Sequence, residues 1–123
     1  MNTIRDLEIH GEMFDMMCLP RTHHAKINIH VGAAYGDKPM ATGNFCKNFH
    51  RLSESVKTRL TVENDDKPSL YTTEELYNDV YKHINIPIVF DYHHHDLHPG
   101  EQSEREALGM ALSTWPLDVR PVV

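Results

Sequence analysis

The stretch from Ile86 to His95 constrains the fold of this chain more than any other part of it. Its first five residues, IPIVF, are all apolar or proline, which is typical of a strand buried on both faces. The stretch then ends in Asp91 and a run of three histidines. A carboxylate at the mouth of a buried strand lowers stability unless something pairs with it. The pattern predicts either a divalent-metal site, since carboxylate and imidazole are common metal ligands, or an exposed histidine-rich loop.

Composition bounds the class of protein. A chain of 123 residues with a net charge of −6 suits one domain or part of one. Its two cysteines, Cys18 and Cys46, lie far apart and outside any CxxC pattern, which favours a reducing compartment over a disulfide scaffold. The sequence has no apolar run of membrane-spanning length and no signal-peptide pattern. We therefore expect an intracellular protein, in the cytoplasm, nucleoid or nucleus, with neither a membrane nor an obligate protein partner.

Hydrophobic periodicity predicts helices that alternate with strands. The expected helices cover 2–17, 39–57, 72–83 and 103–115, and the expected strands cover 25–32, 59–63, 86–91 and 120–123. Two capping boxes, Thr72 with Glu75 and Ser103 with Glu106, mark helix starts. The methionines of the first helix are expected to fill the core. Alternation with short connections predicts an α/β fold with parallel strands.

Each of the first three predicted strands ends in a residue of metal-ligand type. Glu63 follows His30 by 33 residues and Asp91 follows Glu63 by 28, which is about one βα unit each time. Parallel strands bring their carboxyl ends to one edge, where α/β barrels and open sheets place their active sites. We therefore expect these three side chains and His94 to converge on shared positions for divalent metal ions. Side chains that lie on different faces would refute this hypothesis.

Four segments of the chain resemble the UV-damage endonuclease family. They are HVGAAYGDK at 30–38, LTVENDD at 60–66, PIVFDYHHH at 87–95 and STW at 113–115, followed by RPVV. The resemblance implies a xylose isomerase-like TIM barrel related to endonuclease IV, with a cluster of divalent metals at its C-terminal face. Manganese is the metal expected first, with magnesium and zinc as alternatives. The implied activity is nicking of damaged double-stranded DNA on the 5′ side of ultraviolet photoproducts, and also at some abasic sites.

The resemblance also implies a role for each predicted ligand. His30 would bind one metal, Glu63 would bridge two, Asp91 would bind the second and His94 the third, which makes the two carboxylates the catalytic residues. Phosphodiester hydrolysis needs an activated water and neutralised phosphate charge, and paired metals supply both. The sequence shows no Ser–His or Cys–His arrangement that would act as a nucleophile.

Other residues near these segments are assigned less directly. Tyr35 and Lys38 lie in the loop after the first strand, from where they would reach a substrate phosphate, although a solvated surface lysine fits the sequence equally well. Within the histidine run, His93 is expected to face solvent. His23 and His24 precede a strand, at the end opposite the site, and are interpreted as non-functional.

The chain is short for a TIM barrel, which has eight βα units in typically about 200 residues or more. It supplies about three to four units, so residues 1–123 are expected to be the central portion of one barrel domain. Open sheet edges would leave this portion marginally stable and inactive by itself. Two alternatives stay open: another metal-dependent barrel, such as a sugar isomerase that ignores DNA, and an inactive remnant that binds metal or nothing.

Overall fold

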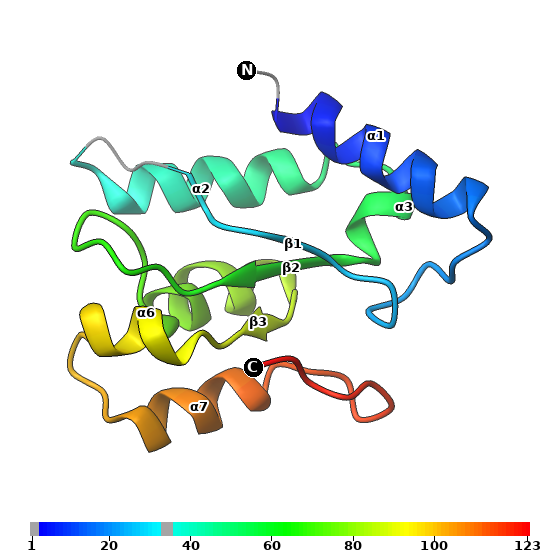
Figure 1. Ribbon diagram of the computed structural model, residues 1–123. Helices are drawn as coiled ribbons and strands as arrows, with labels where there is room; N and C mark the ends of the chain where they lie inside the picture. The colour runs from blue at the N-terminus through cyan, green and yellow to red at the C-terminus, as the bar shows by residue number, and fades with distance from the viewer. Residues whose placement is uncertain (1–2, 33–35) are drawn as a thin grey trace.

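The computed structural model of the chain describes residues 3–32 and 36–123. The strands β1 (Ile27–Ile29), β2 (Leu60–Glu63) and β3 (Ile88–Val89) form one parallel sheet in that order. The helices are α1 (Thr3–Met16), α2 (Lys38–Phe49), α3 (Glu54–Lys57), α4 (Thr73–Leu76), the π-helix η1 (Tyr77–Tyr81), α5 (Lys82–Ile84), α6 (Tyr92–Leu97) and α7 (Glu104–Leu112). Figure 1 shows the sheet in the middle of the molecule, with α1 and α2 above it and α6 and α7 below. The predicted α/β class with parallel strands is confirmed.

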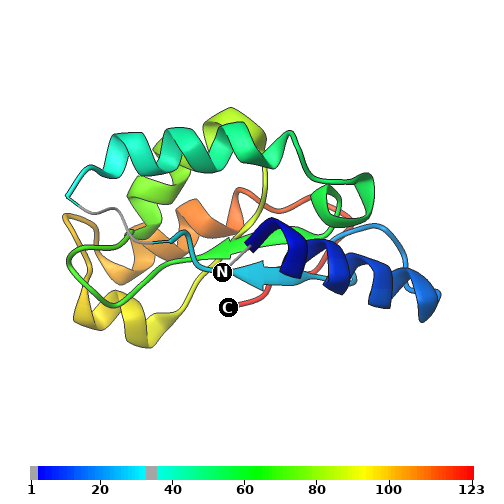
Figure 2. The same ribbon diagram turned by 90° about the horizontal axis from the view of Figure 1, so that it is seen from above.

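The sheet register sends all three strands toward the same edge. Ile29 pairs with Val62, and Glu63 pairs with Val89, so neighbouring strands end within a residue or two of each other. Figure 2 shows the arrowheads of β1 and β2 pointing to the side of the molecule where α6 lies. The residues that follow the strands therefore meet at this carboxyl-terminal edge.

The core lies between the sheet and its helices. Val56, Leu60, Val62, Val80 and Phe90 have no exposed surface. Burying an aliphatic or aromatic side chain of this size stabilises the fold by about 1.5–3 kcal/mol before entropy is subtracted. These contacts fix the strand ends and hence the site.

The helix predicted over 39–57 is interrupted in the structure. It ends at Phe49, and a separate turn of helix, α3, begins after Ser53. Ser53 is extended at φ −70° and ψ 162°, and its backbone N–H donates to Glu8 Oε1 at 2.9 Å. The predicted apolar stripe does reach the core, since Leu52 and Val56 are buried. The prediction of one continuous helix was wrong. Ser53 has extended backbone angles, which are typical of a residue that precedes a helix, so it separates α2 from α3.

The helix predicted over 72–83 begins as expected. Thr72 and Glu75 form the capping box, and so do Ser103 and Glu106 at the start of α7. The segment then changes from α-helix to the π-helix η1 and back to α-helix before it ends at Asn85, which adopts the left-handed conformation at φ 62°. A short polar residue tolerates that conformation, so Asn85 stops the helix.

The strand predicted over 120–123 does not form in the part of the chain that the structure describes. At the free edge of β3, side chains form hydrogen bonds with the backbone groups of Ile88. The Ile88 N–H donates to Thr114 Oγ1 at 2.9 Å, and Trp115 Nε1 donates to the Ile88 carbonyl at 2.8 Å. These two bonds occupy the groups that a neighbouring strand would use. The third strand is also shorter than predicted.

A buried cation closes the opposite end of the sheet. Arg59, which precedes β2, is fully buried, and its guanidinium donates to the carbonyls of Gly11, Leu19, Pro20 and Ser55 at 2.8–3.2 Å. These contacts join the end of α1 to the start of β2.

The methionines of α1 do not fill the core. Met13 is 52% exposed and Met16 is 82% exposed, so that expectation was wrong. The inward face of α1 consists of Leu7, which is buried, with Ile4 and Phe14 packed beside it. Among residues 3–32 and 36–123, no helix has both the length and the apolar character needed to cross a bilayer.

Candidate metal centre

Three of the four predicted ligands meet at the carboxyl-terminal edge of the sheet. His30, Glu63 and His94 each offer a ligand atom, and these atoms all lie within 4.8 Å of one another. Glu63 Oε2 lies 3.2 Å from His30 Nε2 and 3.4 Å from His94 Nδ1. The three residues come from the loop after β1, the last position of β2 and the first turns of α6, so the parallel sheet brings together positions far apart in the chain.

Asp91 lies at the same edge but outside that set of three. It is the N-cap of α6, and its Oδ1 accepts the backbone N–H of His94 at 2.9 Å. Its Oδ2 lies 3.6 Å from His94 Nδ1. The histidine run predicted as part of a loop is therefore a short helix that Asp91 starts, because a carboxylate at this position satisfies a free helix N–H. The role of Asp91 as a ligand stays a prediction.

Asn64 links the ends of β2 and β3, and sequence reasoning missed it. Its Nδ2 donates to the Asp91 carbonyl at 3.0 Å, and the Asp91 N–H donates to Asn64 Oδ1 at 2.7 Å. The asparagine is almost fully buried. Its place directly after a predicted ligand was the available signal, but spacing does not reveal the partner of an amide.

A backbone carbonyl orients His94. The Asn64 carbonyl lies 2.8 Å from His94 Nδ1, and because a carbonyl only accepts, Nδ1 carries the hydrogen. Nε2 is then the lone-pair nitrogen of the neutral ring. Burial lowers the pKa of His94, but the hydrogen bond to Asn64 and the charges of Asp91 and Glu63 outweigh it and raise that pKa above its usual value. The surroundings therefore favour positive charge at this position.

The carboxylate of Glu63 is held from the neighbouring strand. Asn28 Nδ2 donates to Glu63 Oε1 at 3.0 Å, and Thr61 Oγ1 donates to Asn28 Oδ1 at 2.9 Å. One oxygen is thus fixed by the sheet, and the other faces both histidines. Two imidazoles and a carboxylate suit a first-row divalent ion such as Mn²⁺ or Zn²⁺. The His30 side chain is 43% exposed, which leaves one side of the cluster open for water or substrate.

Lys38 has a partner within the fold. Its ammonium donates to both carboxylate oxygens of Glu75, at 3.0 and 2.9 Å, and lies 5.6 Å from the centre of the Tyr71 ring. Its predicted role in binding substrate is untested by these contacts and stays a prediction. Tyr35, the other predicted substrate-binding residue, lies outside the described residues.

The other two histidines of the run differ in exposure. His93 is exposed, as predicted, whereas His95 is 4% exposed and packs against the ring of Phe90. A pocket of about 340 Å³ adjoins the cluster and is lined in part by Glu63, Asp91 and His93. The predicted carboxylates therefore border open space on the surface of the described residues.

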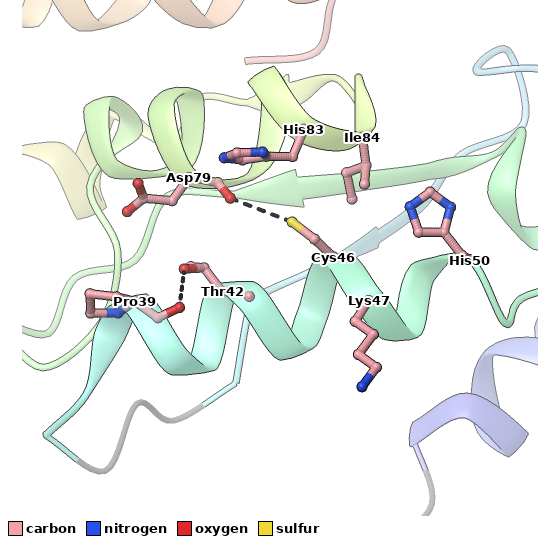
Figure 3. A pocket seen from close by; sticks show the side chains of 9 residues that line it. Pro39, Thr42, Cys46, Lys47, His50, Asp79, His83 and Ile84 are labelled. Carbon is pink, nitrogen blue, oxygen red and sulfur yellow. Dashed lines mark hydrogen bonds between the residues drawn. The ribbon is translucent and has the colours of Figure 1, made fainter.

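A second pocket, of about 550 Å³, lies between α2 and the η1–α5 segment, and none of the four predicted ligands lines it. Figure 3 shows Cys46 there, donating from Sγ to the Asp79 carbonyl at 3.4 Å. Burial and then the charge of Asp79 raise the pKa of the Cys46 thiol. Because the thiolate is the nucleophilic form, this cysteine is poorly suited to nucleophilic catalysis.

Comparisons with known proteins agree with one another. The model of the family described as UV-endonuclease UvdE matches residues 1–120. A UV DNA damage endonuclease of Bacillus velezensis is 41% identical over 115 residues, which cover 93% of this chain and 34% of that protein. One of Bacillus cereus strain G9842 is 41% identical over 114 residues, with the same coverage. The chain thus spans about a third of the length of these curated relatives.

A solved structure extends the comparison to the fold. The crystal structure of SacUVDE superposes with a TM-score of 0.82 at 30% identity, over 92% of this chain and 37% of that one. The match confirms the predicted fold class, a partial TIM barrel, of which this chain shows three parallel strands in the order β1-β2-β3.

Proposed function

This chain belongs to the UV-endonuclease family UvdE, and on that premise we propose that it forms part of the catalytic face of a metal-dependent DNA repair endonuclease. The proposed substrate is double-stranded DNA with ultraviolet damage, nicked on the 5′ side of the photoproduct, with some abasic sites as further substrates. We propose an intracellular location, because an enzyme of this kind works where the chromosome lies. Residues 1–123 would be the central portion of a single barrel domain.

The observation that carries the proposal is the meeting of His30, Glu63 and His94 at the carboxyl ends of three strands. Packing alone gives no reason to gather two imidazoles and a carboxylate there. Divalent ions held at this edge, manganese in the first place, would lower the pKa of a water and offset charge on the phosphate. In the proposed assignment the two histidines bind individual ions, Glu63 bridges two, and Asp91 adds the second carboxylate.

Electrostatics supports the need for a cation. Glu63 and Asp91 point their carboxylates at the same small region, and the chain carries a net charge of −6. A phosphodiester that approached this edge would meet like charge, which raises the energy of a bound anion. Bound divalent ions reverse the sign of the local field. The residues would then hold the ions in place while the adjoining pocket admits the nucleotide.

A plasmid-nicking assay tests the proposal. The longest reading frame that contains this chain is expressed, and supercoiled plasmid, irradiated or not, is incubated with it in Mn²⁺ or in chelator. We expect nicks only in irradiated plasmid and only with metal, and a large loss of rate in Glu63→Gln. Glu74→Gln, at the start of α4, is the matched control. A folded, metal-loaded protein that nicks neither plasmid would refute the proposal and turn attention to sugar isomerisation.

A further inference from the structure

The ring of His30 lies between two carboxylates. Its Nε2 is 3.2 Å from Glu63 Oε2, and its Nδ1 is 3.0 Å from Asp65 Oδ2. The two nitrogens of one imidazole therefore face different partners. Asp65 is not among the residues whose ligand atoms gather within 4.8 Å, so it contacts the cluster through His30.

Asp65 is itself fixed by the turn that follows β2. Its backbone N–H donates to the Tyr71 carbonyl at 2.8 Å, and its Oδ1 accepts the N–H of Asp66 at 2.8 Å. Its side chain is only 13% exposed. One carboxylate oxygen is thus occupied by the backbone, and the other is aimed at His30.

We propose that Asp65 is a positioning residue for His30: it accepts the Nδ1 hydrogen and thereby directs Nε2 toward the ion position beside Glu63. A carboxylate that accepts the second ring hydrogen fixes the tautomer and makes the ligating nitrogen more basic. His30 needs this second contact because its side chain is 43% exposed, and without Asp65 only the contact with Glu63 would hold the ring. His94 differs, because its Nδ1 faces both the Asn64 carbonyl at 2.8 Å and Glu63 Oε2 at 3.4 Å, so of the two histidines only His30 presents separate nitrogens to its two partners.

The first test needs no metal. Nitrogen-15 NMR on the metal-free protein reports whether each ring nitrogen of His30 carries a hydrogen, and we expect one on Nδ1 in the wild type, whether or not Nε2, which faces Glu63, carries one too. Asp65→Ala should move the hydrogen from Nδ1 to Nε2, because Glu63 remains as the other acceptor, and Asp65→Asn, which keeps the shape, should give an intermediate result. Asp96→Asn removes one negative charge from the exposed surface of α6 and should change nothing. An unaltered His30 tautomer in folded Asp65→Ala would overturn the proposal.

The second test measures Mn²⁺ affinity and rests on the proposed function. We expect Asp65→Ala to weaken Mn²⁺ binding by about 10- to 100-fold, the usual cost of losing such an outer partner. In a His30→Ala background the same substitution should weaken it no further, because the histidine it positions is gone. Equal losses in both backgrounds would overturn the proposal, since Asp65 would then act without His30. A chain that binds no Mn²⁺ at all would count against the proposed function, while the tautomer measurement would still decide the role of Asp65.

Discussion

Arg59→Met should destabilise the fold strongly, although Arg59 lies at the end of the sheet remote from the metal cluster. The guanidinium is fully buried and donates to four backbone carbonyls and to Ser55 Oγ. It also lies 3.0 Å from Asp15 Oδ1. Methionine fills much of the same volume but donates nothing, so the carbonyls lose this partner, and the bonds to Gly11 and Ser55 are the buried ones.

The magnitude follows from those contacts. A buried acceptor left without a partner costs about 1–3 kcal/mol, so the buried carbonyls of Gly11 and Ser55 together account for about 2–6 kcal/mol. Asp15 adds little to this cost, because it keeps a bond to Arg21 at 3.0 Å and its side chain is 31% exposed, and the carbonyls of Leu19 and Pro20 belong to exposed residues that water reaches, so the lower part of the range applies. We expect a loss of about 3 kcal/mol, a large share of the roughly 5–15 kcal/mol that stabilises a typical domain.

Urea unfolding followed by fluorescence measures this loss. Trp115 is the only tryptophan in the chain and is 7% exposed, so its emission reports on the folded core directly. Arg105→Met, on the exposed surface of α7, is the matched control and should change stability by less than about 0.5 kcal/mol. A loss below about 1 kcal/mol for Arg59→Met would refute the reasoning, because the carbonyl contacts would then be worth no more than bonds to water.

Two further predictions concern the same half of the molecule. Thr114→Val should lower the free energy of unfolding by about 1–3 kcal/mol because the buried N–H of Ile88 loses its acceptor, and Ser113→Ala in the same urea assay should cost less. Burial lowers the pKa of His23, although its ring also contacts the Leu60 carbonyl. The folded protein therefore favours the neutral ring. The stability that this provides is fully present above the pKa of His23 in the unfolded chain, and it is lost as the pH falls through the pKa of His23 in the folded chain. The free energy of unfolding of His23→Gln should therefore decrease less than that of the wild type below about pH 6.5, the usual pKa of histidine. His24→Gln is the control and should follow the wild type. Equal pH profiles for the two variants would contradict this prediction.

The chemistry of the strand ends was predictable because parallel topology is a strong constraint. Once the predicted strands 25–32, 59–63 and 86–91 are recognised as parts of one parallel sheet, His30 and Glu63 must end at the same edge, and the structure places them there. The capping boxes were equally visible, since each depends on two residues three positions apart.

Other features depend on contacts that spacing does not encode. Helix α6 has six residues, which are too few for an apolar repeat to predict it. Its start depends on the hydrogen bond between Asp91 and the His94 N–H, which is known only from the structure. The burial of Arg59 depends on carbonyls about 40 to 48 residues earlier in the chain. In the sequence Asp65 is one of two adjacent aspartates that follow Asn64, and only its distance of 3.0 Å from His30 indicates a role. These misses share one cause: polar partners are chosen by tertiary geometry.

Mn²⁺ binding by the chain itself tests the central claim most directly. Electron paramagnetic resonance distinguishes free from bound Mn²⁺, and the account predicts saturable binding by the wild type that is lost or weakened at least tenfold in His94→Ala. His93→Ala, one residue earlier on the same helix but exposed, should bind as the wild type does. Equal binding by the two variants, or none by a folded wild-type chain, would contradict the proposal that the strand ends form a metal centre.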